Sequence, residues 1–211
     1  MSNGRFYESQ FEEATIELLR ESHWQYTFGD DIHRKYTDPL IEEDLRTFLA
    51  AQYKDKKLTA SEVDGIVANL RNTGGQNDYY ALQNTFLLYR DGYDFTYSDG
   101  RDNPFRLQYI DFEHPDHNIF RCVNQFVMEQ GRENRRPDIL LFVNGIPVCI
   151  VELKNPTKQN ATIRDAYTQI CTRYMRDIPA LLKYCALAVI SDGAKNKLGT
   201  PYTPFEFFYE W

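Results

Sequence analysis

The 211-residue sequence lacks several features that mark large classes of protein. It has no apolar run long enough to cross a bilayer, and its first residues form no signal peptide, so a membrane or exported protein is not expected. No G-x-x-x-x-G-K-[ST] phosphate-binding loop is present, so a nucleotide-driven motor is not expected in this chain. A compact cytoplasmic α/β domain fits its 42% hydrophobic and 26% charged residues.

Cysteine is scarce, and the four cysteines lie far apart with no C-x-x-C pair. Three of them fall in apolar, strand-like or helical patterns. This distribution predicts reduced, buried thiols in a cytoplasmic protein, and a zinc site built on them is not expected. The four are Cys122, Cys149, Cys171 and Cys185.

Positive charge is also scarce, and the net charge is −7. This negative charge disfavours nucleic-acid binding for the chain as a whole. The shortage is uneven. Residues 1–130 carry 13 Lys/Arg against 23 Asp/Glu, whereas residues 131–200 carry 11 against 6. Because phosphate contacts need positive charge, we expect any DNA path to follow the second of these segments.

The most informative stretch is RPDILLFVNGIPVCIVELKNP, at residues 136–156. Two apolar, β-prone runs at 139–143 and 146–151 flank an Asn-Gly pair, which predicts a β-hairpin. Asp138 opens the first strand, and Glu152 and Lys154 close the second. Side chains two apart in a strand share a face, so Glu152 and Lys154 should point the same way.

The register of this hairpin decides whether Asp138 joins them. A strict two-residue turn pairs Val143 with Ile146 and leaves Asp138 and Glu152 on opposite faces. A bulge, or a longer loop that pairs Val143 with Pro147, sets the two carboxylates across from each other. We favour the longer loop.

Together the three groups predict a catalytic site. Two carboxylates at a sheet end offer the oxygen ligands that Mg²⁺ prefers, with Mn²⁺ as a substitute, so Asp138 and Glu152 are the predicted metal ligands. An ammonium beside them, Lys154, can hold or deprotonate an attacking water and oppose the charge of a pentavalent phosphorane. The alternative is a solvated strand end, in which Glu152 and Lys154 form a surface ion pair that contributes little to stability.

The spacing P-D, thirteen residues, E-L-K resembles the PD-(D/E)xK nuclease signature. The surrounding words RPDILLFVNGIP and VELKNP resemble the N-terminal nuclease domain of type I restriction enzyme R subunits, as do NQF, YMRDIP and the terminal SDG…GT…PFE. The resemblance covers nearly the whole chain and is weakest at residues 38–92. It implies an α/β fold with a restriction-endonuclease-like core, in which helices flank a mixed, twisted sheet of about five to seven strands.

We therefore expect a single nuclease domain over residues 1–211. Helical patterns at 38–92, including a Thr59–Glu62 capping box, predict a helical insertion within it. Three strands are expected at 93–97, 105–112 and 118–128. The HPDH word at 114–117 is expected to be a polar turn rather than a histidine metal site. The motor domains of the resembled family are absent from this chain.

The resemblance also nominates supporting residues. It implies that Glu12, on a helix at 6–22, reaches the metal site, although it could equally be an exposed helix acid. The family carries Gln-x-x-x-Tyr on the helix at 161–177, whereas here Gln169 and Tyr174 are five apart, about 140° around an α-helix instead of about 40°. Tyr174 is therefore expected to support the site, and the role of Gln169 stays open. The basic residues expected to contact DNA are Arg135, Arg136 and Lys158.

The implied activity is that of a type I site-specific deoxyribonuclease, which hydrolyses phosphodiester bonds of double-stranded DNA with Mg²⁺. The implied partners are the methyltransferase and specificity subunits of a restriction–modification complex, and ATP is used by the family's motor domains. Two alternatives remain, a non-catalytic docking module of the same assembly and a RecB-like repair nuclease. The intact triad disfavours the first, and the terminal SDG…GT words disfavour the second.

Overall fold

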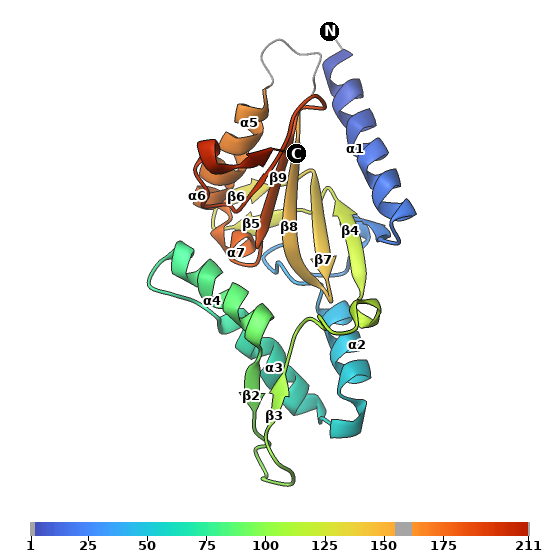
Figure 1. The fold of residues 1–211 in the computed structure, drawn as a ribbon, viewed down its shortest axis with the longest axis vertical. Coiled ribbons are helices and arrows are strands. Elements are labelled where there is room, and N and C mark those ends of the chain that lie inside the picture. The colour runs from blue at the N-terminus through green and yellow to red at the C-terminus, as the bar shows by residue number, and fades with distance from the viewer. Residues whose placement is uncertain (1–2, 155–161, 211) are drawn as a thin grey trace.

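The computed structural model describes residues 3–154 and 162–210. A seven-stranded mixed sheet forms its centre, in the order β1-β4-β7-β8-β9-β10-β11 (Figure 1). Strand pairs β1–β4 and β8–β9 are parallel and the other neighbours are antiparallel. This confirms the expected α/β fold with a mixed sheet. The strands are β1 (Gln25–Phe28), β4 (Phe120–Asn124), β7 (Ile139–Val143), β8 (Ile146–Leu153), β9 (Leu187–Ser191), β10 (Asn196–Gly199) and β11 (Tyr209–Glu210).

Helices cover both faces of the sheet, which explains why β7 and β8 read as nearly continuous apolar runs. Helix α1 packs Ile16 against one face, where Ile139 and Val151 lie. On the opposite face, Ala166 and Ile170 belong to one core with Leu140 and Ile150. The helices of that second layer are α5 (Ile163–Thr168), the π-helical turn η4 (Gln169–Tyr174), α6 (Met175–Asp177) and α7 (Pro179–Leu182), and α1 spans Asn3–Glu21.

The β7–β8 hairpin has the two-residue turn, so the prediction of a longer loop is wrong. Val143 pairs with Ile146 across Asn144 (φ 51°) and Gly145 (φ 74°), as the Asn-Gly pair allows. Asn144 is held in this conformation because its side chain is buried and hydrogen-bonds the chain at residues 109, 118 and 119.

A β-bulge corrects the register farther along the same hairpin. Phe142 pairs with Pro147 but Leu141 pairs with Cys149, so Val148 is the extra residue. The ladder then continues regularly to Ile139 and Val151, and the next positions are Asp138 and Glu152. Proline contributes no N–H to a ladder, which makes its neighbourhood a favourable place for the break. The bulge alternative thus sets the two carboxylates across from each other.

The insertion forms a second layered unit at the turn end of this hairpin (Figure 1). Its helices and a hairpin of its own share one apolar core, which also includes Val143 and Ile146 from the main sheet. Ile41 anchors it by donating its N–H to the Gly145 carbonyl at 2.8 Å. The elements are α2 (Glu42–Gln52), η2 (Lys54–Lys56), α3 (Ala60–Asn72), α4 (Asp78–Asp91), β2 (Tyr93–Phe95) and β3 (Phe105–Leu107).

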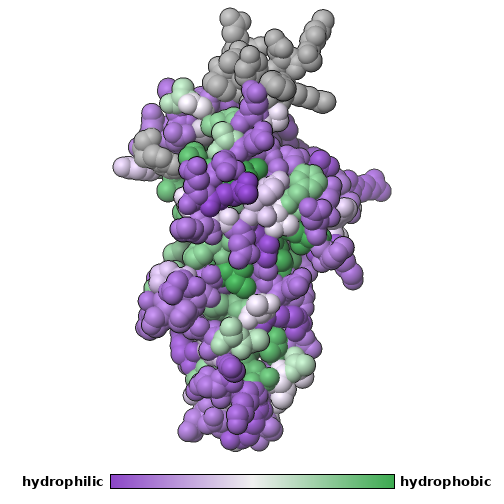
Figure 2. All heavy atoms as spheres, turned by 90° about the vertical axis from the view of Figure 1, so that its right-hand side faces the viewer, coloured by the Kyte–Doolittle hydropathy of each residue, from purple (hydrophilic) through white to green (hydrophobic). Residues whose placement is uncertain are grey.

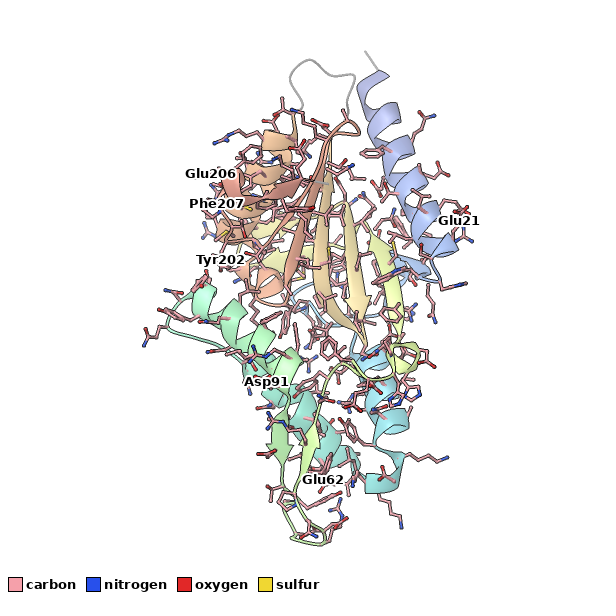
Figure 3. The ribbon with its side chains drawn as sticks, in the orientation of Figure 1. Glu21, Glu62, Asp91, Tyr202, Glu206 and Phe207 are labelled. Atoms are coloured by element: carbon pink, nitrogen blue, oxygen red, sulfur yellow. The ribbon has the colours of Figure 1, made fainter. Side chains whose placement is uncertain are left out.

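Two details of the insertion test the sequence predictions. The Thr59–Glu62 capping box of α3 is confirmed, and Glu62 also pairs with Arg101 from the β2–β3 connection at 2.6 Å (Figure 3). By contrast, β2 and β3 form a two-stranded sheet separate from the main one. The inserted body therefore continues past residue 92, because these short strands bury their apolar side chains in the core that they share with α2 and α3.

The remaining described elements are short: β5 (Met128–Gln130) pairs with β6 (Glu133–Arg135), and η1 (Gly29–Asp31), η3 (Pro115–His117) and η5 (Phe205–Phe207) are 3₁₀ turns. All four cysteines are free, and three are buried, as predicted. Within the described ranges, no helix has the length and apolar character of a bilayer span. The side that Figure 2 presents is mostly hydrophilic, with smaller hydrophobic areas.

Candidate active site

Asp138, Glu152 and Lys154 meet at the end of the β7–β8 hairpin that lies away from its turn. The Asp138 carboxylate accepts a hydrogen bond from the Leu153 backbone N–H at 2.8 Å, which ties it to the neighbouring strand. Lys154 Nζ lies 2.7 Å from Glu152 Oε1. The Glu152 side chain is 0% exposed and that of Lys154 is 12% exposed, so the pair is not a solvated surface ion pair.

Burial changes the protonation of Glu152. Removal from water, followed by the negative charge of Asp138, raises its pKa to about 8, although Lys154 and a hydrogen bond from Tyr174 oppose this rise. A buried carboxyl beside a second carboxyl is costly to ionise unless a cation lies close to both. The sheet end therefore brings two carboxyls close together, and the ammonium of Lys154 bonds one of them, Glu152.

Tyr174 and Gln169 reach the same carboxyl from the covering helix. Tyr174 Oη donates to Glu152 Oε2 at 3.3 Å and accepts from Gln169 Nε2 at 2.7 Å. The segment Gln169–Tyr174 is π-helical, and its i→i+5 bonding brings residues five apart onto one side. The wider π-helical turn thus compensates for the five-residue spacing and places Gln169 in contact with Tyr174.

Glu12 approaches the same end of the sheet from α1. Its carboxylate accepts from Asn124 Nδ2 at 2.7 Å and from Gln125 Nε2 at 3.3 Å. Gln125 has a left-handed backbone (φ 54°) and donates its own N–H to the Asp138 carbonyl at 3.3 Å. Glu12 is therefore linked to the backbone of Asp138 through one residue.

Sequence reasoning did not assign a role to Asn124 or Gln125. The available signal was the NQF word, which places two amides at the end of β4, next to the strand that Asp138 opens.

The three predicted DNA contacts differ in their surroundings. Arg136 is exposed, and its Nη1 lies 3.4 Å from Gln125 Oε1, beside the site. Arg135 instead forms a structural ion pair, with its guanidinium 2.6 Å from the buried Asp177 and 2.5 Å from Glu133. Lys158 lies outside the described residues.

The geometry defines a class, an α/β protein with a buried cluster of acidic and basic side chains at one end of a mixed sheet. Residues 5–207 match the family described as "Type I restriction enzyme R protein N terminus", and the chain belongs to that family.

Two curated relatives match nearly the whole chain. One is the "Type I restriction enzyme HindI endonuclease subunit" of Haemophilus influenzae, 30% identical over 97% of this chain. Another is the "Putative type I restriction enzyme MjaIXP endonuclease subunit" of Methanocaldococcus jannaschii, 31% identical over 95% of this chain. In both alignments the chain spans 20% of the relative's length.

Proposed function

We propose that this chain is the Mg²⁺-dependent endonuclease domain of a type I restriction enzyme R subunit, with a core of the PD-(D/E)xK type. Its reaction is hydrolysis of phosphodiester bonds in double-stranded DNA. The observation that carries the proposal is the convergence of Asp138, Glu152 and Lys154 at one end of the sheet, produced by a bulge that a plain hairpin does not need.

The residues at this end fit a hard divalent cation. Asp138 and Glu152 supply carboxylate oxygens, the ligand type of Mg²⁺ sites. The pKa of about 8 at Glu152 supports the same conclusion, because a cation between the two carboxyls would favour the charged form that burial now disfavours. When bound, Mg²⁺ supplies Lewis-acid polarisation of a phosphate oxygen and lowers the pKa of a bound water. Glu12, held by Asn124 and Gln125, is a further candidate ligand.

Lys154 has the role of positioning the attacking water and, as the neutral amine, of accepting its proton. Its Nζ lies 2.7 Å from Glu152 Oε1 and the side chain is only 12% exposed, so its place beside that carboxyl is well defined. Tyr174 fixes the other oxygen of Glu152, and Gln169 fixes Tyr174. These contacts leave the carboxyl little rotational freedom, which is the preorganisation that phosphoryl transfer requires.

DNA binding is proposed to follow the basic segment around the site. Arg136 and Arg173 are exposed, the first just before Asp138 and the second on η4. The partners proposed for the full subunit are the methyltransferase and specificity subunits, with ATP used by motor domains outside this chain.

The decisive test is a Lys154→Ala substitution in a full-length R subunit that carries this chain, within its assembled enzyme. Plasmid cleavage and ATP hydrolysis are measured together. Cleavage should fall by about 10²–10⁴-fold, the range for a positioned proton-transfer group, while ATP hydrolysis persists. Lys54→Ala, at an exposed lysine of η2, is the matched control and should cut normally. Near-normal cutting by the Lys154→Ala enzyme would contradict the proposed function.

A further inference from the structure

A second cluster of ligand-type side chains lies far from the sheet end described above, in the loop between β3 and β4. Asp111, His114 and His117 each offer one ligand atom, and these atoms lie within 4.8 Å of one another. His114 Nδ1 and His117 Nδ1 face the same oxygen, Asp111 Oδ2, at 3.6 Å and 3.1 Å. The two imidazole rings are stacked, with centroids 4.9 Å apart.

These distances suit a tetrahedral ion. Metal–nitrogen and metal–oxygen bonds of about 2.0–2.1 Å separate neighbouring ligand atoms by about 3.3–3.4 Å in tetrahedral geometry. The two histidine–aspartate separations, 3.6 and 3.1 Å, bracket that value, and the ligand atoms of the two histidines lie within 4.8 Å of each other. A hydrogen bond can join Asp111 Oδ2 to His117, but the 3.6 Å distance to His114 Nδ1 is too long for a second one. A single cation serves both rings and the carboxylate at once.

The backbone around the cluster is already fixed. Asp111 is 4% exposed, and its Oδ1 accepts from the N–H groups of Glu113 and His114 at 3.0 and 2.9 Å. Gln52, at the end of α2, donates to Asp111 Oδ2 at 2.9 Å. Such outer contacts hold a ligating carboxylate in place before an ion arrives.

Asn118 closes the loop at its other end. Its side chain bonds both the N–H and the C=O of Asp111, and Asn144 in the β7–β8 turn bonds Asn118. The cluster therefore lies where the insertion, the loop and the central hairpin meet. An ion held there would join all three.

We propose that Asp111, His114 and His117 form a zinc-binding site that fastens the insertion to the turn of the central hairpin. Two imidazoles and one carboxylate favour Zn²⁺ and similar transition ions over Mg²⁺, which prefers oxygen. The histidine side chains are 61% and 51% exposed, so the ion has access from solvent and keeps a position for water. This site is independent of the proposed cleavage chemistry.

The test is calorimetric titration of the chelator-treated chain with Zn²⁺, repeated on His114→Ala/His117→Ala. Besides any ion at the proposed sheet-end site, the parent should bind one equivalent at this cluster. The double variant should lose more affinity there than the 10–100-fold that loss of an outer contact costs. The matched control is His33→Ala, an exposed histidine elsewhere in the chain, which should bind as the parent does. Asp138→Asn removes a proposed metal ligand at the sheet end, so this variant should still bind Zn²⁺ at the Asp111 cluster.

Thermal unfolding provides a second measurement. At Zn²⁺ about 100-fold above its Kd, the parent should gain roughly 5–10 °C in Tm, and the double variant should gain much less. The two histidines are exposed, so their removal leaves the fold intact, which circular dichroism checks. Equal Zn²⁺ affinity in the parent and the double variant, or no binding by the parent, would overturn the proposal.

Discussion

Replacing Glu152 with glutamine should stabilise the metal-free chain in alkaline buffer. The pKa of Glu152 is raised to about 8 by burial and by Asp138, whereas an unburied glutamate titrates near 4.5. Between these values the folded chain holds a proton that the unfolded chain has released. The stability that this proton confers is complete below about pH 4.5 and is lost as the pH rises through about 8.

The size of the effect follows from the shift. A difference of about 3.5 pKa units corresponds to at most about 5 kcal/mol of lost stability above pH 8, at about 1.36 kcal/mol for each unit. Glutamine has no such proton to lose. Between about pH 5 and about pH 8.5, the stability of Glu152→Gln relative to the parent should therefore rise by roughly 2–4 kcal/mol.

Urea unfolding at about pH 5, 6.5 and 8.5, with chelator present, measures this change directly. Glu21→Gln is the control, because Glu21 is exposed at the end of α1 (Figure 3), and its effect should not vary in the same way. Adding Mg²⁺ at the highest pH should stabilise the parent and narrow the gap. The reasoning fails if the stability difference between Glu152→Gln and the parent stays constant with pH, or if the parent becomes relatively more stable as the pH rises.

Three further outcomes are expected. Gly145→Ala should destabilise the fold by more than about 2 kcal/mol, because its Cβ would lie 2.0 Å from the Ile41 carbonyl oxygen. Gly100 has a similar positive φ but lies in open space, so Gly100→Ala should cost only about 1–2 kcal/mol. Chemical denaturation of the two variants measures the difference. The Arg101 ion pair and the α3 cap hold the pKa of Glu62 down at about 2, so Glu62→Gln should lower the Tm at pH 7 and the deficit should shrink as the pH falls from about 4.5 toward 2. Arg173→Glu should reduce the log–log salt slope of DNA binding by about one or more, and an unchanged slope would place the DNA elsewhere.

The main elements of the site could be predicted from the sequence because they depend on local chemistry. Asn-Gly between two apolar runs specifies a hairpin, and alternation places Glu152 and Lys154 together. The register could not be predicted, because a two-residue turn alone would separate the carboxylates. The bulge at Val148 depends on how both sheet faces pack, and it was therefore visible only in the assembled fold.

Other features depended on contacts between distant segments. The spacing of Gln169 and Tyr174 was judged by α-helical geometry, which a π-turn replaces. Such turns arise when tertiary contacts outweigh regular bonding, and here Tyr174 is buried against Glu152. The HPDH word forms a turn at 115–117, as predicted, but its contact with Asp111 could not be predicted, because Asp111 lies outside that word and is held by Gln52 from the insertion.

The two irregularities share one consequence at Glu152. The bulge adds a residue to β8 and so brings Asp138 across from it, while the π-turn widens the covering helix and so brings Tyr174 and Gln169 over it. Glu152 itself lies in a regular parallel ladder, paired with Ile190 of β9. The buried strand thus sets the position of the carboxyl, and the neighbouring elements depart from regular geometry to meet it. Because each departure costs regular backbone bonding, their agreement at one buried acid is what the proposed cleavage site predicts.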